Sequence, residues 1–134
     1  MENYTTVEFG GKPVGFGHPT CIVFECGATH DGVESAKKLV KAVKDSGADA
    51  VKFQMVDPDR MMSDKDAMVT FMTPEGAKEE SVYDALKRRA LTPDEWRELK
   101  AYCDKIGVIF FSTAAFPDEV DLLVEIGSAA IKIN

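Results

Sequence analysis

A strand, a helix and a second strand within residues 20–56 constrain the fold of this chain more than any other feature. The apolar run 21–24 contains β-branched and aromatic residues, as buried strands do. After a polar turn, residues 36–43 carry apolar side chains at helical spacing, and Gly47 fits the position just past a helix end. The apolar run 50–56 completes the pattern, which predicts a βαβ unit with two parallel strands.

Charged residues interrupt both apolar runs near their C-terminal ends. Side chains alternate between the two faces of a strand, so Glu25 occupies one face of the first strand, and Lys52 and Gln54 share a face of the second. A charge in such a run is costly to bury unless it is paired or meets a ligand. Because ligand sites in parallel α/β proteins lie at the C-terminal strand ends, Glu25 and Lys52 indicate a site there.

The rest of the chain repeats the alternation of helices and strands. Thr92-Pro93-Asp94-Glu95 has the residues of a capping box with proline in the first turn, which predicts a helix start. A third strand at 108–111, a third helix after Phe116 and a fourth strand at 129–134 follow. Strict alternation predicts a parallel sheet, preceded by a hairpin in residues 6–16 around Gly10-Gly11.

Placing the strands side by side collects several polar side chains on one face. Thr113 of the third strand and Lys132 of the fourth join Glu25, Lys52 and Gln54. Two lysines beside a hydroxyl suit a phosphate group, and a carboxylate offers acid–base or orienting chemistry. The alternative is that Glu25 and Lys52 form a structural ion pair, although a second buried lysine would still lack a counter-charge.

Residues 57–90 form a long connection that is rich in methionine and in charge, with a short helix expected at 81–89. Connections of this length within a compact α/β domain are usually functional, which favours a lid or substrate loop. A flexible excursion packed by its own methionines is the other interpretation.

Composition excludes several classes of protein. A chain of 134 residues suits one domain, and its net charge of −7 argues against a nucleic-acid surface. No apolar run is long enough to cross a membrane, and no signal peptide is visible. Three cysteines without a CxxC pair indicate reduced thiols in a cytoplasmic protein, with Cys26 as a small core residue rather than a nucleophile.

Four segments together resemble a known family. They read IVFECGATHDG, AKKLVKAVKDSGADAVKFQ, SVYDALKRRALTPDEWRELKAYCDKIGVIFFST and AAIKIN. In this order they are similar to the N-terminal half of the catalytic barrel of the N-acetylneuraminate (sialic acid, or nonulosonate) synthases. Members of that family are (βα)8 TIM barrels that condense phosphoenolpyruvate with an N-acetylated aldose such as N-acetylmannosamine and release phosphate. A divalent metal, manganese or magnesium, polarises the sugar aldehyde.

The resemblance implies a role for each residue of the cluster. Glu25 matches the catalytic glutamate of the E-x-G motif; the matches to substrate-binding residues are Lys52, Gln54, Ser112, Thr113 and Lys132. His30 matches a family histidine without a clear role, and a loop histidine that only hydrogen-bonds the turn is an equal alternative. Asn134 is a further candidate at the end of the fourth strand. Two departures are Thr29, where the family has asparagine, and the sequence S-T-A-A-F in place of S-T-P-F.

The resemblance also implies a domain organisation. Residues 1–19 would form a hairpin covering the bottom of the barrel, and residues 20–134 its first half, from the first to the fourth strand. The metal-binding histidines of the family lie on later strands, so no metal ligand is expected in this chain. We therefore expect a truncated chain, a split gene product or a fragment. It would be inactive alone and would pair with a second copy, as a dimer, or with the missing half of the barrel.

Three functions remain open from the sequence. The first is the phosphoenolpyruvate-binding half of a cytoplasmic synthase-like transferase of carbohydrate biosynthesis, which forms a carbon–carbon bond. The second is a non-catalytic half-barrel that serves binding or assembly. The third is an enzyme like the class I aldolases, with Lys52 or Lys132 forming a Schiff base.

Overall fold

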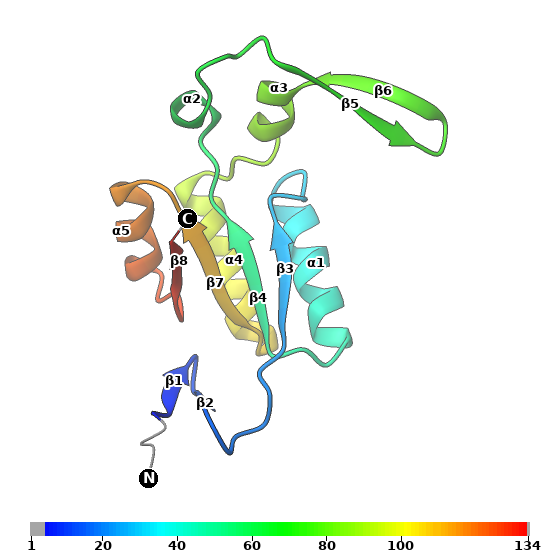
Figure 1. Ribbon diagram of the computed structural model, residues 1–134. Helices are drawn as coiled ribbons and strands as arrows, with labels where there is room; N and C mark the ends of the chain where they lie inside the picture. Colours follow the sequence, from blue (N-terminus) through cyan, green and yellow to red (C-terminus); the bar gives the residue numbers. More distant parts are fainter. Residues whose placement is uncertain (1–4, 134) are drawn as a thin grey trace.

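The computed structural model describes residues 5–133, which are organised around a four-stranded parallel sheet (Figure 1). The strands lie side by side in the order β3 (Val23–Gly27), β4 (Ala50–Gln54), β7 (Ile109–Ala114) and β8 (Ile131–Ile133). All three strand pairs are parallel, as the sequence predicted. The fold is therefore α/β with a parallel sheet, while closure into half of a TIM barrel stays a prediction.

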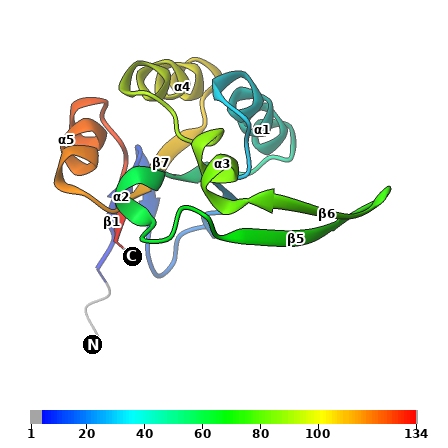
Figure 2. The same ribbon diagram turned by 90° about the horizontal axis from the view of Figure 1, so that it is seen from above.

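Three helices lie together on one side of the sheet: α1 (Val33–Asp45), α4 (Pro93–Ile106) and α5 (Pro117–Glu125) (Figure 2). The predicted start of α4 is confirmed, because the Thr92 hydroxyl and the Glu95 carboxylate form a complete capping box. Its end is confirmed as well, with Gly107 in the left-handed conformation that glycine adopts without strain.

One apolar core fills the space between these helices and the sheet. Phe53 of β4 is fully buried, and its ring centroid lies 6.1 Å from that of Phe110 and 6.2 Å from that of Trp96. Val51 and Leu99 are also fully buried in the same cluster. Cys26 belongs to it too, so the prediction of a core cysteine is confirmed. We call this side of the sheet the covered face.

Within residues 5–133, no helix layer like this one covers the opposite side of the sheet. We call it the open face, and the register places on it the residues Val23, Glu25, Lys52, Gln54, Ile109, Phe111, Thr113 and Lys132. Val23, for example, is 43% exposed. The two faces of one sheet therefore differ in what covers them.

An N-terminal hairpin packs against the N-terminal end of the open face. Its strands are β1 (Val7–Phe9) and β2 (Lys12–Val14). The Phe9 ring meets Phe111 edge-on with centroids 5.3 Å apart. At Gly10, which has φ +56°, a Cβ atom would lie 2.6 Å from the Ile109 side chain, so only glycine allows this approach. A hairpin was predicted here; the division of the chain at residue 19 stays a prediction.

Residues 57–90 contain more regular structure than the sequence suggested. They form α2 (Pro58–Met61), β5 (Met68–Thr73), β6 (Gly76–Ser81) and α3 (Val82–Lys87), and β5 and β6 pair as an antiparallel hairpin that projects from the body (Figures 1 and 2). The short helix expected at 81–89 is confirmed as α3. The hairpin was not predicted, although Thr73-Pro74-Glu75-Gly76 has the residues of a β-turn joining two extended runs. The methionines do not pack the segment either, since Met68 is 54% and Met72 78% exposed.

No helix in the described part of the chain is long and apolar enough to cross a membrane.

Candidate functional site

Two rows of side chains cross the open face near the C-terminal strand ends. In the first row, Glu25 of β3 lies opposite Lys52 of β4. In the second, Gln54 of β4 lies opposite Thr113 of β7, and Thr113 lies opposite Lys132 of β8. The sheet thus brings together five of the residues that the sequence assigned to the site.

An ion pair joins the two residues of the first row. Lys52 Nζ lies 2.9 Å from Glu25 Oε2, and the Lys52 side chain is only 12% exposed, whereas that of Glu25 is 60% exposed. The second carboxylate oxygen, Oε1, accepts a hydrogen bond of 2.6 Å from the Gly27 amide. Both carboxylate oxygens of Glu25 therefore have a partner, and Glu25 is the more exposed residue of the ion pair.

A register shift in β3 makes the Gly27 contact available. The pairing passes from Glu25 with Lys52 directly to Gly27 with Phe53, which leaves Cys26 as the extra residue of a bulge. Regular alternation of the strand therefore ends at Glu25 and does not continue through Gly27. Gly27 has φ +42°, a left-handed conformation that favours glycine and turns its N–H toward the carboxylate. The E-x-G spacing thus fixes the direction of the glutamate.

The second row leaves one polar atom without a partner. Thr113 is 1% exposed, and its Oγ1 has no hydrogen-bond partner in the structure. Gln54 is half-buried and Lys132 is exposed. With strands about 5 Å apart and alternate residues about 7 Å apart, the Cα atoms of Lys52 and Lys132 are about 12 Å apart. Two extended lysine side chains can reach an anion between those positions, next to the Thr113 hydroxyl.

Ser112 lies on the covered face, away from the two rows. It is fully buried, and its hydroxyl donates 3.2 Å to the Thr113 carbonyl. The structure therefore places only Thr113 of the Ser112-Thr113 pair with the lysines. Asn134 lies outside the described residues.

His30 follows β3 and lies inside the protein. It is fully buried, its ring centroid is 5.8 Å from that of Phe53, and neither ring nitrogen has a hydrogen-bond partner in the structure. Burial lowers the pKa of His30, and the charges of Asp31, Arg89 and Glu95 modify it further. His30 thus packs behind the sheet rather than in the two rows, and it does not hydrogen-bond the turn.

Cys26 is placed next to the ion pair but on the opposite face. Burial, and secondly the charge of Glu25, raise the pKa of its thiol. A thiol with a raised pKa is a poor nucleophile. Cys26 therefore adds no nucleophile to the open face, where the ionisable groups are the Glu25 carboxylate and the lysines.

The site does not have the composition of a metal centre. Within residues 5–133, no group of three or more His, Cys, Asp or Glu side chains could hold a metal ion. The neighbour of the Glu25 carboxylate is the ammonium group of Lys52, and an ammonium repels a cation. The described residues of this face consequently do not fit a divalent metal ion.

A cavity lies away from the two rows, in the helix layer. It measures about 720 Å³ and lies between α2, α4 and α5, with Met55, Trp96 and Leu122 in its wall. None of the residues of the two rows lines it.

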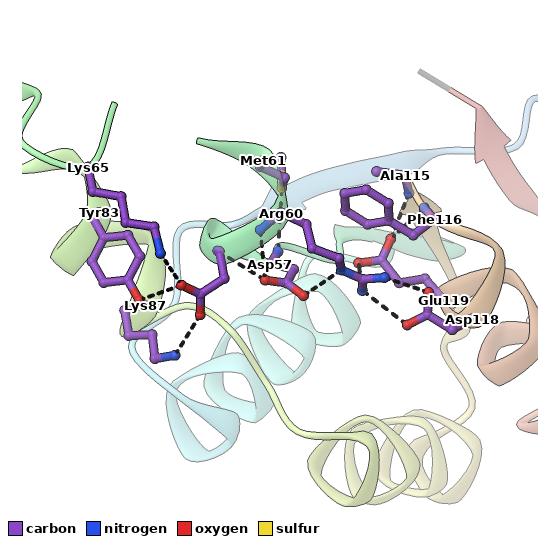
Figure 3. Close-up of polar contacts among 11 residues, drawn as sticks. Asp57, Arg60, Met61, Lys65, Tyr83, Lys87, Ala115, Phe116, Asp118 and Glu119 are labelled. Carbon is purple, nitrogen blue, oxygen red and sulfur yellow. Dashed lines mark hydrogen bonds and ion pairs between the residues drawn. The ribbon is translucent and has the colours of Figure 1, made fainter. Parts of the chain in front are cut away.

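A polar network beside this cavity was missed from the sequence. Arg60 of α2 bonds Asp57 and Asp118, and Asp59 bonds Lys65, Tyr83 and Lys87 (Figure 3). Asp57 followed by Pro58 is an N-cap with proline in the first helical turn, and this signal could have located α2. Nothing in the local sequence pairs Arg60 with Asp118, which is 58 positions away.

Comparisons with known proteins converge on one family. The model of the NeuB family matches residues 39–134. N,N'-diacetyllegionaminic acid synthase of Legionella pneumophila is 31% identical over 92% of this chain and 35% of its own length. The spore coat polysaccharide biosynthesis protein SpsE of Bacillus subtilis is 36% identical over 94% of this chain and 33% of its own length.

A solved structure supports the fold. The sialic acid synthetase of Leptospira borgpetersenii, crystallised with citrate, superimposes with a TM-score of 0.78. The match covers 97% of this chain and 41% of that one at 24% identity, so it shows the similarity of the folds. The chain spans about a third of the length of the curated relatives it matches.

Proposed function

This chain belongs to the NeuB family, and from that membership we propose that its open face binds phosphoenolpyruvate for condensation with an N-acetylated aldose. The observation that carries the proposal is the convergence of Lys52, Gln54, Thr113 and Lys132 at the C-terminal strand ends, beside Glu25. The names of the relatives support it, since the L. pneumophila protein is a legionaminic acid synthase. The complete reaction is proposed for a protein that contains this chain.

The two lysines supply the anion-binding part of the proposal. Phosphoenolpyruvate carries a carboxylate and a phosphate, and charge-assisted hydrogen bonds to such groups are about twice as strong as neutral ones. Lys52 is mostly buried and is now neutralised by Glu25, while the Thr113 hydroxyl has an unused hydrogen-bonding capacity. Binding of the ligand would give the Lys52 ammonium and the Thr113 hydroxyl an anionic partner.

Glu25 supplies the proton-transfer or orienting part. When an anionic ligand replaces Glu25 as the partner of Lys52, Oε2 becomes available while Oε1 stays on the Gly27 amide. The carboxylate would then be directed toward the ligand and able to accept a proton or to orient the sugar. This assignment keeps the glutamate in the role that the resemblance implied.

Calorimetric titration with phosphoenolpyruvate tests the binding part. Lys52→Met should weaken binding by about 2–5 kcal/mol, the range for removing one partner of a buried charge pair. The matched control is Lys38→Met, which removes an exposed lysine of α1 on the outside of the molecule. Equal affinity for the unchanged chain and the Lys52 variant would remove Lys52 from the site.

The chain alone is expected to bind but not to turn over. We propose that condensation needs further barrel strands, and a phosphate-release assay with manganese and an N-acetylated aldose measures it. The sheet edges β3 and β8 also lack a neighbouring strand within the described residues, and edge strands favour association with another chain. We propose that a second copy, or the remaining half of a barrel, covers them; light scattering would show a monodisperse monomer if this is wrong.

A further inference from the structure

A single helical turn, α2, joins two parts of the molecule through adjacent residues. It follows β4 directly, with the Asp57 side chain accepting the amides of Asp59 (3.0 Å) and Arg60 (3.3 Å) as an N-cap. Figure 3 shows that the Arg60 side chain extends toward the start of α5, while Lys65, Tyr83 and Lys87 surround the neighbouring carboxylate. Because Asp59 and Arg60 are adjacent, α2 connects α5 to α3.

Arg60 uses its whole guanidinium group in this connection. Nη1 and Nη2 donate to the two carboxylate oxygens of Asp118 at 2.6 and 3.0 Å, and Nε donates 2.6 Å to Asp57. The group also lies 3.9 Å from the centroid of the Phe116 ring. A bidentate contact of this kind fixes the orientation of the guanidinium group as well as its distance from the carboxylate, which a lysine ammonium cannot do.

Glu119, which follows Asp118 and lies 3.9 Å from Arg60 Nη2, holds the turn before α5. Glu119 is only 8% exposed, and its carboxylate accepts the amides of Ala115 (2.7 Å) and Phe116 (3.2 Å). The turn between β7 and α5 is thereby fixed to the first turn of α5. Arg60 contacts this turn at Phe116, which is three residues after Thr113 of the proposed site.

Asp59 forms the second connection. It accepts hydrogen bonds from Lys65 at 2.5 Å and from the Tyr83 hydroxyl at 3.0 Å, and Lys87 lies 3.5 Å away. These contacts lower the pKa of Asp59 to about 2, with Lys65 as the main cause. The start of the 57–90 segment is therefore fastened to its end, and the β5–β6 hairpin lies between the two.

The cavity of about 720 Å³ explains why Arg60 matters for the position of α2. This space separates α2 from α4 and α5, so apolar packing does not fill the gap between them. Arg60 and Asp118, which both line the cavity, bond one another across this gap. The direct polar contacts between α2 and α5 that the structure records all come from Arg60.

We propose that Arg60 is a positioning residue that sets where the 57–90 segment stands relative to Lys52, Gln54 and Thr113 at the strand ends. The proposal rests on the proposed phosphoenolpyruvate site. It follows from the geometry, because Arg60 ties the segment after β4 to the turn after β7. These two strands supply Lys52, Gln54 and Thr113, and their last rung is the bond from the Met55 amide to the Thr113 carbonyl, at 3.0 Å.

The test compares Arg60→Gln with Arg97→Gln. Arg97 makes the same kind of contact, with Nε and Nη2 on Glu125 at 2.8 and 3.1 Å and Nη1 on Asp94 at 2.8 Å. Its exposure is similar, 43% against 39%, and it also lines the cavity, but it joins α4 to α5 and does not touch α2. Arg60→Lys is the conservative variant, because it keeps the positive charge but loses the bidentate contact.

Two measurements are made on the folded chains, amide hydrogen exchange and calorimetric titration with phosphoenolpyruvate. In Arg60→Gln, amides of residues 57–90 should exchange faster, and affinity should fall about 5- to 150-fold, the usual range of coupling between sites. Arg97→Gln should keep the affinity of the unchanged chain, and Arg60→Lys should be intermediate. A merely structural role would lower the melting temperature of both glutamine variants without this difference in affinity.

The outcomes separate the two proposals. If the unchanged chain does not bind phosphoenolpyruvate, the proposed function is wrong, and the positioning role in binding is wrong with it. If the unchanged chain binds and Arg60→Gln binds equally well, only the positioning role is wrong. If exchange in residues 57–90 is the same in Arg60→Gln and in the unchanged chain, Arg60 does not hold the segment.

Discussion

On the covered face of the sheet, Val51, Phe53 and Phe110 are buried against helices, whereas the open face carries Glu25 and Lys52 a few ångströms away on the same strands. The difference follows from alternation, because neighbouring residues of a strand point to opposite faces. Apolar burial on the covered face stabilises the fold. The polar side chains of the open face are not part of the buried apolar cluster, and the proposed ligand site is made from them.

Among the substitutions that compare the two faces, Phe53→Ala on the covered face should lower the free energy of unfolding most. Phe53 is fully buried and contacts the rings of Trp96, Phe110 and His30. Removing such a ring costs about 3–5 kcal/mol, out of a total stability of about 5–15 kcal/mol for a typical domain. Urea denaturation measures the loss. A loss below about 1 kcal/mol would mean that the covered face is not the stabilising one.

Glu25→Gln is the counterpart on the open face. If Glu25 has the proposed role, turnover of a longer protein that contains this chain should fall by about 10²- to 10⁴-fold, the usual contribution of a positioned acid or base. The melting temperature should change by only a few degrees, since the Glu25 carboxylate is 60% exposed and an ion pair open to solvent on one side contributes about 0–1 kcal/mol.

Glu98→Gln is the matched control for Glu25→Gln. Glu98 is 52% exposed and pairs with Lys37 on the outer helices, an arrangement similar to that of Glu25 with Lys52. Its replacement should leave turnover unchanged. A Glu25 variant that unfolds readily, while its folded fraction keeps normal activity, would support the structural ion pair instead.

Two valine substitutions compare the faces with the same chemical change. Val51→Thr places a hydroxyl in the core and should cost about 1–3 kcal/mol for the unsatisfied polar group. Val23→Thr, on the neighbouring strand, affects a side chain that is 43% exposed, and the expected change is within about 0.5 kcal/mol. Denaturation of the two variants in parallel measures the difference. Equal losses would mean that the open face is buried in solution, as it would be in a closed assembly.

The smallest effect concerns the pH dependence of stability. His30 is buried and uncharged, and its folded-state pKa is lowered from 6.5. The unfolded chain therefore binds a proton more readily, so stability is complete above about pH 6.5 and falls as the pH drops toward the folded-state pKa. Urea midpoints at pH 7.5 and 5.5 should differ less in His30→Leu than in the unchanged chain.

His18→Leu is the control for the pH experiment, because His18 is the other histidine of the chain and is exposed. It should keep the pH dependence of the unchanged chain. If His30→Leu keeps it as well, the loss of stability between these pH values has another origin.

The sequence predicted the sheet well, because its signals are local. The capping box at Thr92, the apolar runs and the glycines after helices all act within a few residues of one another. The β5–β6 hairpin was missed because its apolar residues are exposed, so no burial pattern marks its faces. Placing Lys52, Thr113 and Lys132 together needed only alternation and parallel pairing.

The parts of the site that the sequence did not predict depend on three-dimensional details. The bulge at Cys26 changes which group of the backbone meets Glu25, and strand alternation does not signal it. Arg60 and Asp118 meet only because the turns after β4 and β7 are neighbours in space. Such contacts depend on the fold as a whole and not on the composition of either segment.

Titration of backbone amide NMR signals with phosphoenolpyruvate locates the ligand on the protein directly. Binding at the open face should give saturable shifts at Glu25, Gly27, Lys52, Gln54 and Thr113, with little change at Trp96 and Leu122 beside the cavity. Shifts centred on Trp96 and Leu122, with the open face unaffected, would contradict it and would locate the ligand in the helix layer.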